Sequence, residues 1–184
     1  MPANVFLTGP IRFGKSTLLS QAISESSLPM GGYFVQRLIQ AGRTMAFRVA
    51  DIAHEPYIPD IEVREIDKYT DIIGYIGDQM TWHPEVLEEK GTALIRQALS
   101  TEKTLVLMDE LGRIELKAPG FRQAVFDALD SQQLVLGVLK QESNAFLDAI
   151  RSRENVLVLD LNHMTHQAAL HELTVLIKAK QEPT

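Results

Sequence analysis

Short apolar runs alternate along this chain with stretches in which apolar residues recur every three or four positions. The first pattern is typical of strands buried on both faces, and the second of helices with one buried face. The apolar runs predict strands over residues 3–8, 104–108, 134–139 and 156–161. The periodic stretches predict helices over 15–26, 84–100, 121–129, 145–151 and 165–178. Because strands and helices alternate, the sequence predicts an α/β fold with a mostly parallel sheet covered by helices on both faces.

One segment departs from this alternation. Two β-rich runs, 33–39 and 44–52, flank a short connection that contains Gly42, which predicts an antiparallel β-hairpin. A parallel sheet needs no such hairpin, so we expect it to be an insertion near the functional site. It would serve either as a flap or acceptor platform, or simply as an antiparallel edge of the sheet. Three of its residues could reach a phosphate if it folded over the site: Arg37, Arg43 and Arg48.

Residues 53–82 carry the weakest structural signals of the chain. Pro56 and Pro59 interrupt any regular element in the first part of this segment. We expect a short strand over 62–66 and another short element over 71–77.

The composition is that of an ordinary globular protein. With 184 residues, 45% hydrophobic and 23% charged, the chain is expected to form one domain over residues 1–184. No apolar run approaches the roughly 18 residues that suggest a membrane span, and no secretory signal is apparent at the N-terminus. Cysteine is absent, which excludes a disulfide framework and fits a cytoplasmic location.

The net charge of −6 is unevenly distributed along the chain. Residues 1–50 hold five Lys and Arg against one acidic residue, whereas residues 51–90 hold three against eleven. The basic first segment suits a polyanionic small ligand, and the acidic one is most simply a solvated face. No cluster of Lys and Arg resembles a nucleic-acid footprint, so no nucleic-acid partner is expected.

The clearest chemical signal lies between the first predicted strand and the first predicted helix. Residues 9–16 read G-P-I-R-F-G-K-S, which matches the phosphate-binding loop G-x-x-x-x-G-K-[ST] in its strand–loop–helix context. Backbone N–H groups of such a loop surround an anion, and the helix N-terminus adds a favourable dipole. Lys15 would reach the outer phosphates, and the Ser16 hydroxyl would ligate Mg²⁺. The predicted nucleotide-binding residues are Gly9, Pro10, Ile11, Arg12, Phe13, Gly14, Lys15, Ser16 and Thr17.

Arg12 stands two residues before Gly14, where many phosphate-binding loops carry a third glycine. A residue other than glycine in the left-handed region costs about 1–2 kcal/mol. Arg12 therefore either tolerates this strain or marks a loop of a different shape. Its guanidinium either adds a charge at the phosphates or, as we expect, points into solvent.

A second signal follows the apolar run at 104–108. This run ends in Asp109 and Glu110, and an apolar strand that ends in an acid is the second half of the phosphate-loop machinery. Asp109 would hold the magnesium ion, directly or through water, and Glu110 would orient or deprotonate an attacking water. The alternative is that Asp109 caps a turn and that Glu110 is merely exposed.

Two further features place this second signal beside the first. Gly9 and Asp109 both fall at the carboxyl ends of predicted parallel strands, which is where sites in such sheets lie. Asp109 to Gly112 also reads D-x-x-G, and a glycine at this point would let its backbone N–H approach a terminal phosphate.

Four stretches of the chain combine into one recognisable set: 5–19, 31–49, 108–116 and 145–162. The stretch M-D-E-L-G-R-I-E-L at 108–116 is the most specific, because phosphate loops alone occur in many families. The set resembles the small P-loop nucleoside-triphosphatases that are sometimes called the cancer-related NTPase family. The resemblance implies that residues 9–16 bind phosphates, that Asp109 holds magnesium and that Glu110 assists hydrolysis. It also implies hydrolysis of ATP, with GTP and other nucleoside triphosphates open as substrates.

Two other functions stay open at this level. A nucleotide or nucleoside kinase would need an acceptor site and an arginine-bearing lid, for which Arg151 and Arg153 are candidates. A nucleotide-dependent switch or accessory protein is compatible with the D-x-x-G stretch, although the chain lacks Asn-Lys-x-Asp for guanine. An arginine finger is worth about 10³–10⁵ in rate, and none is assignable, so slow turnover of broad base specificity is expected.

Overall fold

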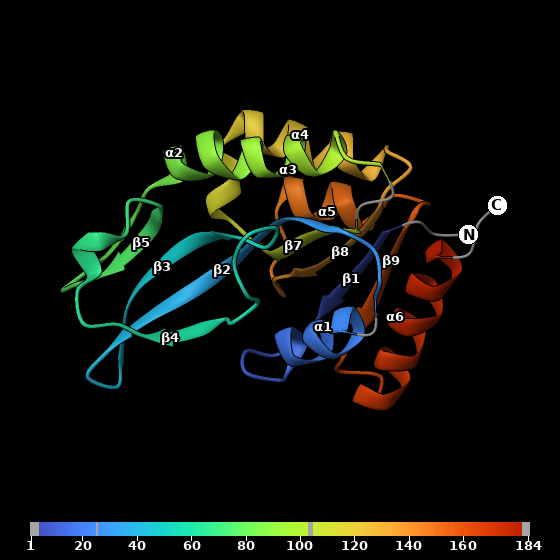
Figure 1. The fold of residues 1–184 in the computed structure, drawn as a ribbon, viewed down its shortest axis with the longest axis horizontal. Coiled ribbons are helices and arrows are strands. Elements are labelled where there is room, and N and C mark those ends of the chain that lie inside the picture. The colour runs from blue at the N-terminus through green and yellow to red at the C-terminus, as the bar shows by residue number, and fades with distance from the viewer. Residues whose placement is uncertain (1–3, 25, 103–104, 182–184) are drawn as a thin grey trace.

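The computed structural model describes residues 4–24, 26–102 and 105–181, which form a single mixed β-sheet with helices on both faces (Figure 1). The strand order is β6-β5-β3-β2-β7-β8-β1-β9, with β4 paired to β2. The strands are β1 (Asn4–Thr8), β2 (Met30–Gln40), β3 (Arg43–Asp51), β4 (Asp60–Glu62), β5 (Ile72–Ile76), β6 (Met80–Trp82), β7 (Leu105–Leu111), β8 (Leu134–Leu139) and β9 (Val156–Asp160). The strands from β2 through β7, β8 and β1 to β9 pair in parallel, as predicted.

Helices lie against the two faces of this sheet and bury separate apolar clusters. The helical segments are α1 (Lys15–Ser24), η1 (Ile66–Lys68), α2 (Pro84–Val86), η2 (Leu87–Gly91), α3 (Thr92–Leu99), η3 (Ile114–Lys117), α4 (Pro119–Leu129), α5 (Ala145–Arg151) and α6 (His166–Gln181). Leu94, Phe121 and Phe146 bring α3, α4 and α5 into one cluster, whereas Leu19 and Leu173 bring α1 and α6 into the other. The predicted covering of both faces is therefore confirmed (Figure 1).

Local sequence signals explain where several helices begin. Pro84 and Pro119 open α2 and α4, where the fixed φ of proline suits the first turn and its missing N–H is not needed. Asn144 caps α5, because its side-chain oxygen accepts hydrogen bonds from the backbone N–H groups of Phe146 and Leu147 at 3.1 and 2.9 Å.

The predicted antiparallel hairpin is confirmed by the pairing of β2 with β3, but it is part of the main sheet rather than an insertion, which corrects that part of the expectation. Its first strand, β2, pairs in parallel with β7, so Phe34 lies opposite Asp109 in the middle of the sheet. The same strand pairs antiparallel with β3, and β3, β5 and β6 continue the antiparallel part to the sheet edge. The sheet thus changes direction at β2. This arrangement favours the antiparallel-edge alternative over a separate flap.

Other differences fall in the segment with weak signals. The strand expected at 62–66 is wrong, because β4 ends at Glu62, where its pairing with β2 ends, and a 3₁₀ turn begins at Ile66. The edge strand β6 is an element that the sequence pattern does not predict. The helix predicted over 84–100 contains one π-helical turn, η2, within which Gly91 packs on the ring of Phe121.

Some predicted element ends cannot be compared with the structure. Residues 3, 25 and 104 lie outside the described residues. Within the described part of the chain, no helix is both long and apolar enough to cross a membrane.

Candidate nucleotide-binding site

The loop between β1 and α1 has the conformation that its glycines permit. Gly9 and Gly14 have φ of 149° and 80°, and Arg12 between them has φ of 61°. Arg12 therefore takes the left-handed conformation that many such loops assign to glycine, and its side chain is exposed, as expected. Ile11 and Phe13 are exposed apolar residues of the same loop.

The side chain of Lys15 folds back onto the first residues of the phosphate loop. Its Nζ donates hydrogen bonds to the carbonyl oxygens of Gly9 and Pro10 at 2.8 and 2.7 Å. Partial burial lowers the pKa of Lys15, and the charges of Glu110 and Asp109 oppose that shift. The two acids of β7 are thus close enough to Lys15 for their charges to act on it.

His166, at the start of α6, supports the far side of the loop. Its ring lies 5.2 Å from the ring of Phe13, and its Nε2 is 2.6 Å from the carbonyl oxygen of Phe13. A side-chain carbon at Gly14 would lie 3.1 Å from the same nitrogen. Sequence reasoning missed this contact, because 153 residues separate the two partners and no motif joins them.

Asp109 is the buried acid at the centre of the site. The Ser16 hydroxyl donates to Asp109 Oδ2 at 3.0 Å, and the Tyr57 hydroxyl donates to the same oxygen. Burial raises the pKa of Asp109 to about 6, although both hydroxyl donors oppose that shift. The structure therefore brings together the two residues that the sequence assigned to magnesium, and it adds Tyr57 to them.

Tyr57 comes from the connection between β3 and β4, where the sequence signals were weak. Its ring packs edge-to-face on Phe34 with ring centres 5.1 Å apart. The next residue, Ile58, is held by its carbonyl oxygen, which accepts a 2.6 Å hydrogen bond from the Gln36 side chain. Burial also raises the pKa of the Tyr57 hydroxyl, so the hydroxyl keeps its proton and donates a hydrogen bond to Asp109.

Arg48 anchors the connection that carries Tyr57. Its side chain is 8% exposed, and its guanidinium contacts both oxygens of Glu55 at 2.6 and 2.5 Å, Asp71 at 3.1 Å and Gln36 at 2.9 Å. Arg37 pairs with Asp60. These two arginines are thus committed to polar partners around the hairpin rather than to the phosphate loop.

The side chain of Glu110 is partly open to solvent near the end of β7. It is 33% exposed, and its Oε1 lies 3.2 Å from Lys140 Nζ at the end of the neighbouring strand. The Tyr33 hydroxyl donates to the Glu110 carbonyl oxygen at 3.2 Å. Tyr33 lies in the 31–49 stretch of the resemblance, whereas Lys140 belongs to no motif that would single it out in the sequence.

Gly112 has a hydrogen-bonding partner within its own turn. Its backbone N–H donates to Glu115 Oε2 at 2.9 Å, so an approach of this N–H to a terminal phosphate stays a prediction. Burial raises the pKa of Glu115 to about 7. The glycine instead makes room for Lys140, whose Cδ would lie 2.7 Å from a side-chain carbon at this position.

The arginines considered for a kinase lid have structural partners. Arg151 donates to the Lys140 carbonyl oxygen at 2.6 Å and pairs with Asp148 at 2.9 Å. Arg153 pairs with Asp130 and lies over the ring of Phe126. These partners hold both side chains around α5, so the structure gives no support to a role in a lid.

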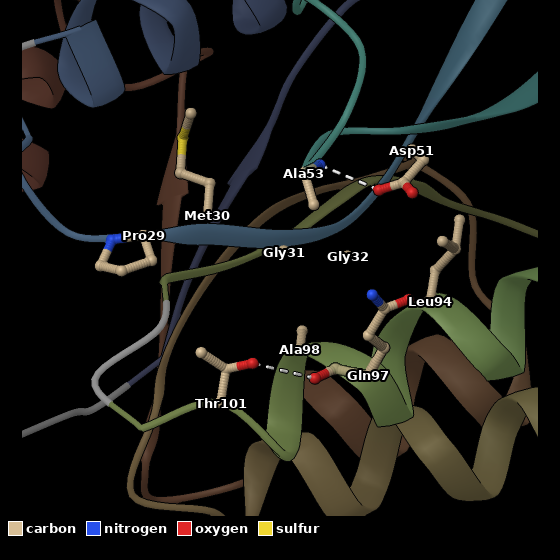
Figure 2. Close-up of a pocket in the computed structure, with 10 residues that line it drawn as sticks. All are labelled: Pro29, Met30, Gly31, Gly32, Asp51, Ala53, Leu94, Gln97, Ala98 and Thr101. Carbon is tan, nitrogen blue, oxygen red and sulfur yellow. Dashed lines mark hydrogen bonds between the residues drawn. The ribbon is translucent and has the colours of Figure 1, made fainter.

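A small cavity lies apart from these residues. Figure 2 shows its lining, which includes Met30 and Gly32 of β2, Asp51 of β3, and Leu94 and Gln97 of α3, around a volume of about 60 Å³. Met30 pairs with Leu105 at the beginning of β7, whereas Asp109 lies near its end. The cavity therefore lies at the amino ends of the parallel strands, whereas the phosphate loop lies at their carboxyl ends.

The fold and the loop define the class of protein. The chain has a strand, a loop of the phosphate-binding pattern and a helix that begins at Lys15, and the Ser16 side chain of that helix contacts Asp109 at the end of β7, one strand away from β1, as in P-loop nucleoside-triphosphatases. A sequence model of the NTPase family matches residues 4–174, so the chain belongs to that family. It is accordingly an enzyme of the nucleoside-triphosphatase class, and the resemblance inferred from its motifs is confirmed.

Individual relatives cover nearly the whole chain. Nucleoside-triphosphatase THEP1 of Thermotoga petrophila is 28% identical over 175 residues, which cover 95% of this chain and 92% of that protein. The human cancer-related nucleoside-triphosphatase is 24% identical, and the match covers 99% of this chain and 100% of that protein. A solution structure of a human cancer-related nucleoside triphosphatase superposes with a TM-score of 0.73 at 21% identity, covering 97% and 99%. The crystal structure of THEP1 from Aquifex aeolicus superposes with a TM-score of 0.70 at 16% sequence identity, and the match covers 95% of this chain and 99% of that chain. The two structures share the fold.

Proposed function

We propose that this protein hydrolyses nucleoside triphosphates to diphosphates and phosphate in a magnesium-dependent reaction, slowly and with broad base specificity. The observation that carries the proposal is the contact between Ser16 on the phosphate-loop helix and Asp109 on β7. The relatives named as nucleoside-triphosphatases support the same reaction class. ATP is the first substrate to test, followed by GTP and the pyrimidine nucleotides. The absence of cysteine from the sequence supports a cytoplasmic location.

The donor atoms at this contact fit a magnesium ion. Magnesium prefers oxygen ligands, keeps several waters and binds through one or two protein groups together with substrate phosphates. The Ser16 hydroxyl and the buried Asp109 carboxylate supply two such oxygens 3.0 Å apart. The raised pKa of Asp109 reflects a buried carboxylate that a cation would favour in its ionised form. When bound, the ion would neutralise charge on the phosphates.

The residues of the chain then divide the remaining work. The backbone N–H groups of residues 9–16 surround the phosphates, and Lys15 exchanges its contacts with loop carbonyls for contacts with the outer phosphates. Glu110 orients the attacking water and accepts its proton. Slow turnover is part of the proposal because no arginine finger has been assigned, and Arg151 and Arg153 are engaged in packing.

The test is phosphate release from ATP, GTP, CTP and UTP, with and without magnesium. We expect release to need magnesium, to be lost in Lys15→Ala, and to fall by about 10²–10⁴ in Glu110→Gln, the range for a general base. The Glu110→Gln variant should still bind nucleotide. Glu154→Gln, at an exposed position, is the matched control and should behave as the unaltered protein. Tight binding without release would contradict the proposal, as would full release by Glu110→Gln.

A kinase or a switch would give different results in the same assays. Phosphate transfer only on addition of an acceptor would identify a kinase. A partner affinity that differs between the diphosphate and triphosphate forms would identify a switch. The contacts of Arg151 and of the Gly112 N–H lend no support to either alternative.

A further inference from the structure

Lys140 leaves the sheet between the two parts of the nucleotide site. It follows β8, the strand that lies between β1 and β7. The Thr8 hydroxyl, just before the phosphate loop, donates to the Leu139 carbonyl oxygen at 2.9 Å. On the other side, the backbone N–H of Lys140 donates to the Leu111 carbonyl oxygen at 2.9 Å. Lys140 therefore lies at the carboxyl ends of the parallel strands, between the phosphate loop and Glu110.

Both the backbone and the side chain of Lys140 are positioned by neighbours. Arg151 holds the Lys140 carbonyl oxygen at 2.6 Å. The aliphatic stem passes over Gly112, where any side chain would collide with its Cδ at 2.7 Å. The ammonium group then lies 3.2 Å from Glu110 Oε1. A glycine and an arginine thus place one cation beside the acid that is assigned to the attacking water.

This ion pair is poorly suited to a structural role. The side chain of Lys140 is 43% exposed and that of Glu110 is 33% exposed, and ion pairs open to water contribute little to folding stability. Such a pair can also exchange partners easily. A triphosphate at residues 9–16 would bring several negative charges to the same edge of the sheet, and a compact, flexible ammonium group is well suited to contact phosphate.

We propose that Lys140 is a phosphate-contacting residue, whose ammonium group moves from Glu110 to the terminal phosphate when a triphosphate binds. The movement leaves the Glu110 carboxylate free to accept a hydrogen bond from the attacking water. Lys140 thereby distinguishes a triphosphate from a diphosphate and supplies a cation from within the chain. The inference rests on the proposed function, because it assigns Lys140 to the same site.

The test compares Lys140→Met with Lys140→Arg and with Lys178→Met, a control that removes an exposed lysine of α6. Equilibrium binding of ADP and of a non-hydrolysable ATP analogue is measured with magnesium. We expect Lys140→Met to lower the ratio of triphosphate to diphosphate affinity by about tenfold or more, the effect of one charge-assisted hydrogen bond. Its phosphate release should fall by about 10²-fold, as for one lost transition-state donor.

The controls separate this role from a structural one. The melting temperature of Lys140→Met should stay that of the unaltered protein, Lys140→Arg should recover part of the affinity ratio, and Lys178→Met should change neither quantity. An unchanged affinity ratio in Lys140→Met would overturn the proposal. So would faster phosphate release, because Lys140 would then only restrain Glu110. If the unaltered protein releases no phosphate, the proposed hydrolysis fails, and the affinity ratio still decides the role of Lys140.

Discussion

Replacing Tyr57 by Phe removes one hydroxyl and keeps the ring that packs on Phe34. That hydroxyl donates a hydrogen bond to the carboxylate of Asp109, a residue that is only 6% exposed. Hydrogen bonds to charged groups contribute about 1.5–3 kcal/mol, and the buried carboxylate of Asp109 has little water to replace the lost donor. We therefore expect Tyr57→Phe to lower the free energy of unfolding by about 2 kcal/mol at pH 8, where Asp109 is ionised.

The pH dependence of this loss makes the prediction sharper. Burial raises the pKa of Asp109 from 3.8 to about 6 in the folded protein, so folding favours its protonated form. The stability that this carboxyl contributes is complete below pH 4 and is lost as the pH rises through about 6, to the extent of about 3 kcal/mol. The Tyr57 hydroxyl opposes the shift, so Tyr57→Phe raises the pKa of Asp109 further. The variant should consequently lose more stability at pH 8 than at pH 5.

Urea unfolding at pH 5 and pH 8 measures both quantities, with Tyr75→Phe as the control for loss of a phenolic hydroxyl at an exposed position of β5. We expect Tyr75→Phe to change the free energy of unfolding by less than about 0.5 kcal/mol. An equal loss in Tyr57→Phe at both pH values would refute the reasoning. A loss at pH 8 no larger than that of Tyr75→Phe would also refute it.

Three further predictions concern the same region and its supports. Magnesium-dependent phosphate release should fall as the pH drops through about 6, since protonated Asp109 no longer binds a cation; a pH–rate profile at limiting magnesium checks this, and saturating magnesium should move the fall to lower pH. Arg48→Met should destabilise the protein by about 3 kcal/mol in urea unfolding, because it leaves Glu55 and Gln36 without their buried partner and Asp71 with Lys90 alone. Asn144→Ala should cost about 1 kcal/mol for the lost helix cap, which lowers the melting temperature by about 2–4 °C in calorimetry.

Much of the fold could be predicted because its signals are local. The apolar runs that became β8 and β9 and the periodic stretches that became α4 and α5 lie within two residues of their predicted ends. The segment 53–82 could not be read in this way. β4 and β6 are three residues long and exist as strands because β2 and β5 offer them hydrogen-bonding edges. Pairing of this kind leaves little trace in a short sequence.

The same contrast holds for the site. The pattern at residues 9–16 and the acids after the apolar run are linear motifs, so Ser16 and Asp109 could be assigned to one magnesium ion from the sequence alone. Tyr57 and Lys140 follow no motif. They reach the site through the Arg48 network and through the end of β8.

The sequence by itself determined the class of fold, and it predicted the loop and the residue types that would meet the phosphates, whereas the structure showed that Arg12 takes the left-handed conformation. These features depend on neighbours along the chain, through backbone sterics, hydrophobic periodicity and the loop pattern. Only the tertiary structure decided that β2 is a central strand, that the N–H of Gly112 is occupied and that Lys140 stands beside Glu110. Those outcomes depend on which strands become neighbours, because side chains far apart in sequence meet only where the sheet order brings their strand ends together.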